Sequence, residues 1–446
     1  MDKKSILAIL QDWNYWSKPS QDTFSRNTYE TEIIQKSSTE EIIFLKGVRR
    51  SGKSTILHNH IRNLIDKGIP AEQILFVNLE DPRFTPDLST SLLEEIKQTY
   101  IHYLNPKDKP YIFLDEIQNV DNFEKWLLKE YELKSAHLFA TGSNSKLLSR
   151  EIGSSLSGRY LDIEVFPLSF KEFLNFKNCD IKTEFDLVVK SVDVNRYFEE
   201  FMFYGGFPKV VLTDDPQLKE AELKSYFDSI LLRDIVARYQ LDNFRILEQL
   251  SIFLLSSISN PISINKIKNN LGVSYDLASR YFEYLQNTYL IHSIPLFDWS
   301  LKKQIANPKK IYSIDTGLSK RISFEVGGRI GDMLENIIYV ELKRRFSDIY
   351  YFKTAQNYEI DFLIKNKEKI THLIQVSQSV QDHKTKNREL RALVKAQSEL
   401  KYAKTATLQL ITMDDSRQEN IDGNNVQIIN AIEWLLGGQP PRTHQE

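Results

Sequence analysis

Cysteine is nearly absent from this chain: its 446 residues contain only one. A lone cysteine, Cys179, cannot form an internal disulfide, which excludes the disulfide-stapled secreted proteins and predicts a reducing compartment. Long apolar runs are lacking as well, since none approaches the ~20 residues that a helix needs to cross a bilayer. The apolar run near the N-terminus is too short for a signal peptide. The sequence therefore predicts a cytoplasmic protein with no membrane partner.

An excess of either charge is also lacking. Lysine and arginine number 58 and aspartate and glutamate 60, which gives a formal net charge of −2. A global basic field for nucleic acid is therefore excluded, and any contact with DNA must come from a local patch. The apolar share of 41% is ordinary for a globular protein, and the length predicts about three domains.

A glycine-bounded loop follows the first apolar run, 42–45, and precedes a helical pattern of apolar residues over 56–65. A strand, such a loop, Lys-Ser and a helix form the layout in which backbone N–H groups and a helix N-terminus hold a nucleotide's phosphates. Glycines let the backbone turn tightly and approach the anion closely. The residues predicted to bind the nucleotide are Gly47, Arg49, Arg50, Ser51, Gly52, Lys53, Ser54 and Thr55.

Two adjacent acids, Asp115 and Glu116, end the third apolar strand, at 111–114. They lie at the carboxyl end of the strand, the edge where open α/β sheets bind ligands. We expect Asp115 and the Ser54 hydroxyl to hold Mg²⁺, and Lys53 to reach the β- and γ-phosphates of ATP. Glu116 is the base expected to polarise an attacking water. The two motifs in this order predict an enzyme that hydrolyses ATP to ADP.

Apolar strands alternate with helical patterns through the first 166 residues. The alternation predicts an α/β fold of the P-loop type, with a mostly parallel sheet covered by helices on both faces. Ser143 and Asn144 follow the fourth strand, where a short polar side chain can orient the attacking water. A helix N-cap explains Ser143 equally well, and both roles are open.

Two further blocks complete a family resemblance: Ser-Gly-Arg-Tyr at 157–160 and Phe-Pro-Leu-Ser-Phe-Lys-Glu-Phe at 166–173. With the paired arginines, the Asp-Glu strand end and Thr-Gly-Ser, the chain resembles a bacterial and archaeal family of AAA+-type, STAND-like ATPases, usually named only as ATP-binding proteins. The resemblance implies four parts. They are an ATPase core with an N-terminal helical extension (1–166), a helical lid (167–245), a winged helix-turn-helix (246–325) and a restriction-endonuclease-like domain (326–446).

The same resemblance gives Arg159 the role of an arginine finger. Such a finger reaches the γ-phosphate of a neighbouring copy and neutralises charge in the transition state, so it implies a homo-oligomer. The alternative is a surface arginine paired with Asp162 or Glu164, which contributes little to stability. Weaker candidates for the finger are Arg49, Arg50, Arg233 and Arg238.

Two helical patterns separated by a turn at 272–274 precede apolar runs at 290–294 and 309–314, which agrees with a winged helix. Contact with DNA is open, because the second helix carries Arg280 but also Glu283. The lysines that offer flanking contacts are Lys266, Lys268, Lys302, Lys303, Lys309 and Lys310. The alternative function is therefore a nucleotide-gated DNA-binding or regulatory protein with negligible hydrolysis.

The C-terminal part has one acid in a helical pattern, Glu335, and one on a strand, Asp361, as restriction-type nucleases do. Gln375 and Ser377 stand on the next strand, where a nuclease needs Glu and Lys. Loss of an anionic ligand and of the cation predicts a degenerate domain without nuclease activity. A basic amphipathic helix follows and is a second candidate contact for DNA; its outward residues are Lys384, Lys386, Arg388, Arg391 and Lys395.

Overall fold

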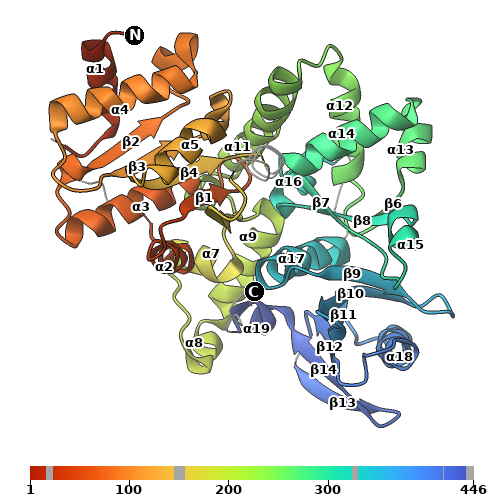
Figure 1. Ribbon diagram of the computed structural model, residues 1–446. Helices are drawn as coiled ribbons and strands as arrows, with labels where there is room; N and C mark the ends of the chain where they lie inside the picture. The colour runs from red at the N-terminus through yellow and green to blue at the C-terminus, as the bar shows by residue number, and fades with distance from the viewer. Residues whose placement is uncertain (17–23, 145–155, 324–329, 415, 438–446) are drawn as a thin grey trace. The chain divides into compact units, whose positions relative to one another are not determined.

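The computed structural model describes residues 1–16, 24–144, 156–323, 330–414 and 416–437 (Figure 1). The chain forms two compact units, residues 1–166 with 287–289, and residues 167–286 with 290–446. None of the described helices combines the length and the apolarity that a membrane span requires.

A five-stranded parallel sheet forms the centre of the first unit. Its strands are β1 (Ile42–Lys46), β2 (Ile74–Asn78), β3 (Tyr111–Asp115), β4 (His137–Gly142) and β5 (Tyr160–Glu164), in the spatial order β2-β3-β4-β1-β5. Continuous apolar runs such as β1 suit a strand that is buried on both faces. Because the strands are parallel, the carboxyl ends of β1, β3 and β4 lie at one edge of the sheet. The predicted α/β fold of the P-loop type is confirmed.

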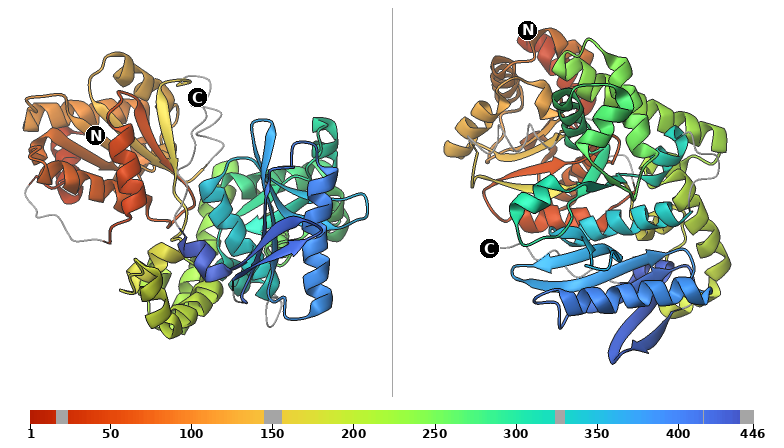
Figure 2. Two further views of the ribbon diagram at one scale, coloured as in Figure 1. Left: turned by 90° about the horizontal axis from the view of Figure 1, so that it is seen from below. Right: turned by 90° about the vertical axis from the view of Figure 1, so that its right-hand side faces the viewer.

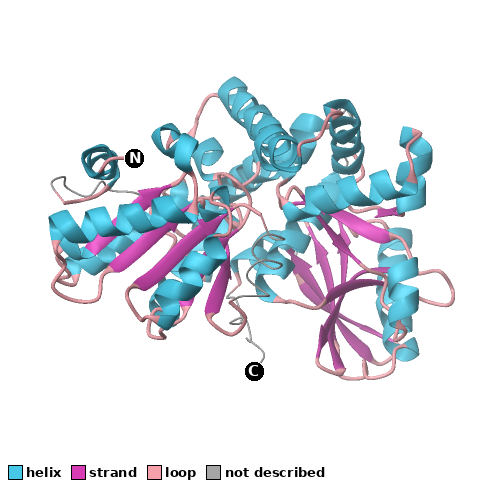
Figure 3. Cartoon of the chain, turned by 45° about the horizontal axis from the view of Figure 1, so that its top comes forward, coloured by secondary structure: helices cyan, strands magenta, loops and turns pink. Residues whose placement is uncertain are grey.

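Helices cover both faces of this sheet (Figure 3). On one face lie α1 (Lys3–Trp13), α4 (Thr90–Leu104) and α5 (Phe123–Glu132), and on the other α2 (Asn27–Lys36) and α3 (Lys53–Asp66). Side chains alternate along each strand: Phe44 packs into the first core, and Ile43 and Leu45 pack into the second. The short 3₁₀ helices of this unit are Ala71–Gln73, Pro82–Asp87 and Ile117–Asn119.

The second unit begins with helices. They are α7 (Phe170–Phe176), α8 (Glu184–Val189), α9 (Ser191–Tyr204), α10 (Pro208–Leu212), α11 (Pro216–Ser229), the π-helix η4 (Ile230–Ala237) and α12 (Phe244–Leu255). Next come β6 (Pro261–Ile262), α13 (Ile264–Leu271), α14 (Tyr275–Asn287), β7 (Ile291–Ile294), α15 (Leu301–Ala306), β8 (Lys309–Ser313) and α16 (Thr316–Ile322). The three short strands form an antiparallel sheet in the order β6-β8-β7.

A six-stranded mixed sheet completes the second unit. Its strands are β9 (Ile349–Lys353), β10 (Glu359–Asn366), β11 (Lys369–Ser377), β12 (Thr407–Thr412), β13 (Arg417–Ile421) and β14 (Asn424–Asn430), in the order β13-β14-β12-β11-β10-β9. Helices α17 (Ile330–Arg345) and α19 (Ala431–Leu436) pack on one face and α18 (His383–Glu399) on the other (Figure 2). Helices α7 and α9 share the core of α17, so the segment after residue 167 packs with the C-terminal sheet.

A buried carboxylate holds the turn between α9 and α10. The Oδ2 atom of Asp315 accepts the Gly206 N–H at 2.7 Å, and its Oδ1 accepts the Leu318 N–H at 3.3 Å, which caps α16. Gly205 has φ +74°, and a Cβ there would lie 1.9 Å from the Oδ1 of Asp315. Only glycine fits this position, because it combines a positive φ with contact against a side chain.

Burial raises the pKa of the Asp315 carboxyl to about 6, although backbone N–H groups such as that of Gly206 favour the charged form. The folded pKa exceeds the unfolded one, so the contribution of Asp315 to stability falls as the pH rises from about 4 to about 6. We compare the free energy of unfolding of Asp315→Asn with that of the wild type at two pH values. Because asparagine does not titrate, we expect this difference to shift in favour of the variant by about 2 kcal/mol from about pH 4 to about pH 7. Urea denaturation at each pH measures it, and an equal difference at the two pH values would contradict the raised pKa.

Candidate functional site

The predicted phosphate loop joins β1 to α3. A Cβ on Gly47 would lie 2.1 Å from the carbonyl oxygen of Val165, so only glycine fits where the loop leaves the sheet. Arg50 and Gly52 both have positive φ, +68° and +99°, and Gly52 is the N-cap of α3. The loop therefore ends at a helix N-terminus, where unpaired N–H groups and the helix dipole favour an anion.

Lys53, the first residue of α3, is only 4% exposed. Its Nζ donates to the carbonyl oxygens of Gly47 and Val48, both at 3.1 Å, and lies 3.6 Å from the Oε1 of Glu116. A buried ammonium needs such partners because it has lost its hydration. Phosphate oxygens of a nucleotide can take the place of these two carbonyl oxygens as acceptors for the Lys53 ammonium.

One hydroxyl connects the two acids at the end of β3. The Oγ1 of Thr141 donates to the Oδ1 of Asp115 at 2.6 Å and accepts the N–H of Glu116 at 2.9 Å. The Oγ of Ser54 donates to the same Asp115 oxygen at 3.0 Å. Thr141 was not among the predicted site residues. It lies near the carboxyl end of β4, the strand between β3 and β1, and this position is what brings it to both acids.

The two acids are separated in pKa by their surroundings. Burial, and then the charge of Glu116, raises the pKa of Asp115 to about 6. Burial also opposes ionisation of Glu116, but Lys53 and Arg49 outweigh it and hold the pKa of Glu116 below its usual value. Such a pair suits a site in which Glu116 is ionised and a cation bound beside Asp115 stabilises the charged form of that acid.

A glutamine links Glu116 to the end of β4. The Nε2 of Gln118 donates to the Oε2 of Glu116 and to the Oγ of Ser143, the latter at 3.2 Å. Glu116 has φ +55°, a strained conformation for a residue with a side chain. Ser143 and Asn144 are both fully buried. The helix that Ser143 would cap falls in residues 145–155, outside the described part of the chain, and no pattern in the sequence pointed to Gln118.

The other predicted loop residues lie around this centre. Arg49 is buried, and its Nη1 lies 2.7 Å from the Oε1 of Glu80, just after β2. Arg50 and Thr55 are exposed, whereas Ser51 is buried. The structure thus brings Lys53, Ser54, Asp115, Glu116 and Ser143 together.

Arg159 lies at the other end of the sheet. Its carbonyl oxygen accepts the N–H of Ile42, the first residue of β1, whereas the phosphate loop follows the last residue of that strand. A strand of five residues separates the two ends by roughly 16 Å. Its Nε lies 2.9 Å from the Oε1 of Glu132. Arg159 therefore forms a surface ion pair, as the alternative to the finger expected, but not with Asp162 or Glu164. Within one chain Arg159 is remote from the loop, and a role in a neighbouring copy stays a prediction.

In the second unit the two predicted acids meet around a lysine. Lys310 of β8 is 1% exposed. Its Nζ lies 2.7 Å from the Oδ1 of Asp361, 2.8 Å from the Oε1 of Glu335 and 3.0 Å from the Oε1 of Glu359. The prediction that Lys310 contacts DNA was wrong, because these acids bury its ammonium.

The residues that replace nuclease ligands make other contacts. The Oε1 of Gln375 accepts the N–H of Asp361 at 3.3 Å, and the Oγ of Ser377 donates to the carbonyl of Ser379 at 3.0 Å. Burial, and then the charge of Asp361, raises the pKa of Glu335 to about 8. Across the described ranges, no group of three or more His, Cys, Asp or Glu side chains is arranged to hold a metal ion.

Comparisons with known proteins identify the family. Residues 39–174 match the model of an AAA domain, and residues 195–324 and 330–433 match two domains of unknown function. An uncharacterized protein of Methanocaldococcus jannaschii is 35% identical over 420 residues, 91% of this chain and 90% of the relative. This chain belongs to the same AAA+-like family of ATP-binding proteins, which confirms the predicted resemblance. An uncharacterized protein of Haemophilus influenzae in this family is 32% identical over 92% of this chain and 98% of the relative.

Solved structures show weaker likenesses to this member of the family. The Walker-type ATPase of Pyrococcus abyssi has 15% identity and a TM-score of 0.45, covering 69% of this chain and 99% of that one. A STAND protein from Pyrococcus horikoshii has 13% identity and a TM-score of 0.29, covering 74% and 47%.

Proposed function

We propose that this protein is a Mg²⁺-dependent ATPase whose nucleotide state repositions its C-terminal domains. The observation that carries the proposal is the network in which Thr141 joins Asp115 and Glu116 beside the buried Lys53. An ammonium, a hydroxyl-carboxylate pair and an ionised acid at the edge of one sheet suit phosphoryl transfer to water. Membership of an AAA+-like family supports ATP as the nucleotide.

The loop and the acids fit a nucleotide and a magnesium ion. The Oγ of Ser51 is buried and has no hydrogen-bond partner among the residues that the structure describes. Buried polar atoms without partners are uncommon, so such an atom in this loop supports a polar ligand. The oxygens of Ser54 and Asp115 are the kind that Mg²⁺ prefers, together with phosphate oxygens. When bound, Mg²⁺ would neutralise charge on the β- and γ-phosphates.

The geometry gives each side chain a role. Lys53 exchanges its bonds to loop carbonyls for bonds to the β- and γ-phosphates, which releases Glu116 from the ion pair. Glu116, held ionised, then takes a proton from the water that attacks the γ-phosphate. Gln118 holds the second oxygen of Glu116 and keeps Ser143 beside it. We place Asn144 near the same water.

Arg159 completes the proposed site from outside. Because it lies at the far end of its own sheet, we assign it to the nucleotide of a neighbouring copy, in a homo-oligomer. Its exposed ion pair with Glu132 is of a kind that contributes little to stability, so the guanidinium can exchange that partner for a phosphate.

Lys53→Met is expected to weaken ATP binding at least about tenfold, because it removes the buried cation of the loop. Isothermal titration calorimetry with ATP and MgCl₂ measures the dissociation constant, and phosphate release measures hydrolysis. Lys67→Met is the matched control, since Lys67 is an exposed lysine just beyond the far end of α3. Wild-type protein that neither binds nor hydrolyses ATP, or equal affinities in the two variants, would contradict the proposal.

A further inference from the structure

A buried arginine ties the phosphate loop to the end of the first unit. Arg26, just before α2, is 3% exposed, and its Nη1 donates to the carbonyl oxygens of Ser51 and Phe166, both at 2.9 Å. Ser51 belongs to the phosphate loop, and Phe166 is the last residue before the chain enters the second unit. One guanidinium therefore connects the candidate nucleotide site to the exit of the unit.

Further contacts hold the same exit against the loop. The N–H of Phe166 donates to the Oη of Tyr29 at 3.1 Å, and the guanidinium of Arg26 lies over the Tyr29 ring, 4.5 Å from its centroid. The carbonyl of Val165 lies so close to Gly47 that a Cβ there would be 2.1 Å from it. A displacement of the loop backbone must therefore move Phe166 or break buried hydrogen bonds.

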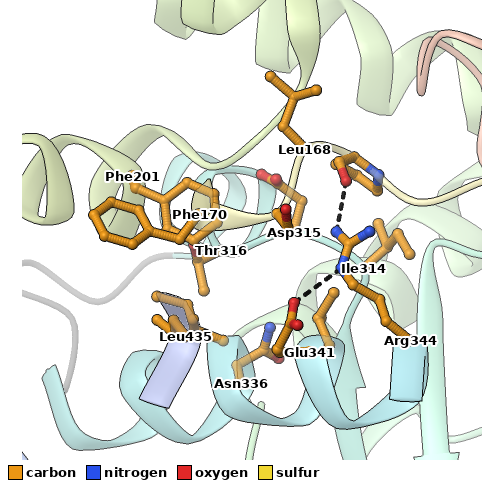
Figure 4. A pocket seen from close by; sticks show the side chains of 14 residues that line it. Leu168, Phe170, Phe201, Ile314, Asp315, Thr316, Asn336, Glu341, Arg344 and Leu435 are labelled. Carbon is orange, nitrogen blue, oxygen red and sulfur yellow. Dashed lines mark hydrogen bonds and ion pairs between the residues drawn. The ribbon is translucent and has the colours of Figure 1, made fainter. Parts of the chain in front are cut away.

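The next carbonyl in the chain is held by an arginine of the second unit. The Nη2 of Arg344, on α17, donates to the carbonyl oxygen of Pro167 at 2.6 Å, and its Nε lies 3.3 Å from the Oε2 of Glu341 (Figure 4). Both side chains are less than a tenth exposed. The contact borders a cavity of about 20 Å³, room for a single water. The carbonyl of Phe166 therefore accepts a hydrogen bond from Arg26 of the first unit, and the next carbonyl, that of Pro167, accepts one from Arg344 of the second unit.

The residue types at the junction resist bending. Proline has a fixed φ, and it restricts the residue before it to extended conformations. Phe166 and Pro167 therefore have little freedom to absorb a displacement. Hydrogen bonds from a charged guanidinium are shorter and stronger than those between neutral groups, so the two arginines are suited to transmit movement.

We propose that Arg26 is a positioning residue of the nucleotide site and that, together with Arg344, it couples the phosphate loop to α17 through the Phe166–Pro167 junction. The proposal rests on the proposed binding of ATP. When Lys53 leaves the loop carbonyls for the phosphates, the loop backbone adjusts. Arg26 carries that adjustment from Ser51 to Phe166, and Arg344 passes it from Pro167 to α17.

Hydrogen exchange of the full-length protein, with and without saturating ATP and MgCl₂, tests this coupling. In the wild type we expect ATP to change exchange both in the loop and in α17. Arg344→Met should bind ATP within about twofold of the wild type, because its contacts lie in the second unit, yet lose the change in α17. Arg26→Met should bind about tenfold more weakly and lose the change in α17 even at saturation.

Arg345→Met is the matched control for Arg344. Arg345 is the next residue on α17 and also contacts Glu341, but it donates to the carbonyl of Trp434 instead of that of Pro167. We expect this variant to keep the ATP-induced change in α17. If Arg26→Met does not fold, Arg26→Lys, which keeps the buried charge, is judged on the same two measurements.

The outcomes separate the coupling from the proposed function. Wild-type protein that does not bind ATP overturns the proposed function. ATP binding without any change in α17, or a change that survives in Arg344→Met, overturns only the coupling. An Arg26 variant that folds and binds ATP as tightly as the wild type overturns the positioning role.

Discussion

Glu116→Gln is expected to bind ATP about as tightly as the wild type and to lose hydrolysis by roughly 10²- to 10⁴-fold. Glutamine keeps the size of the side chain and an oxygen for the Gln118 N–H, so the local structure should persist. It cannot accept a proton from water. Lys53 and Arg49 hold the pKa of Glu116 below its usual value despite burial, so the wild-type residue is ionised at neutral pH and its charge is what the variant removes.

Single-turnover phosphate release at saturating ATP measures this effect, and calorimetry measures binding in parallel. Glu72→Gln is the matched control, because Glu72 is exposed and precedes β2 at the amino end of the sheet. We expect the control to hydrolyse ATP like the wild type. Unchanged hydrolysis in Glu116→Gln would mean that another residue takes the proton from the attacking water. A loss of ATP binding in that variant would mean that Glu116 helps to hold the nucleotide.

Lys310→Met is expected to lower the free energy of unfolding of the second unit by about 3–5 kcal/mol. The substitution removes the only cation that lies within 4 Å of Glu335 and Asp361 among the described residues. Glu359 loses one of two cations, since it also lies 3.2 Å from the Nζ of Lys353. Buried carboxylates without a cation repel one another and have lost their hydration. Because the pKa of Glu335 is raised to about 8, protonation relieves part of this effect, and the loss should shrink at lower pH.

Urea denaturation followed by circular dichroism measures the loss, with Lys309→Met as the matched control. Lys309 precedes Lys310 on β8 and is only partly buried, so its removal should change stability by no more than about 0.5 kcal/mol. The charge-balanced variant Lys310→Met with Glu335→Gln should regain part of the loss. Equal stability of Lys310→Met and Lys309→Met would show that the three acids do not depend on the ammonium.

The lysine also bears on the predicted degeneracy of the C-terminal domain. Its ammonium lies between Glu335 and Asp361, the two acids that a nuclease would use to hold a metal ion. A positive charge built into the chain competes directly with a cation for those oxygens. Lys310 also supplies a cation beside the two acids, which the sequence pattern lacked at Ser377. The absence of nuclease activity therefore stays a prediction.

The parts of the site that depend on neighbours along the chain could be predicted without the structure. β1, the loop and α3 are continuous, so their apolar periods and glycines were sufficient to predict the turn at which Lys53 lies. Asp115 and Glu116 were predictable because a buried strand delivers its last residues to the carboxyl edge of a parallel sheet. The α/β class followed from the same alternation of strands and helices.

Contacts between side chains far apart in the sequence could not be predicted in the same way. Thr141 fixes both acids because β4 lies beside β3, and Arg26 reaches a residue 25 positions away and another 140 positions away. Lys310 resembled a solvated basic residue until Glu335, Glu359 and Asp361 were placed around it, and Arg159 is paired with Glu132 in place of its near neighbours. Periodicity and local spacing record which face of an element is apolar. They do not record which elements become neighbours, and hydrogen bonds and ion pairs between elements depend on that arrangement.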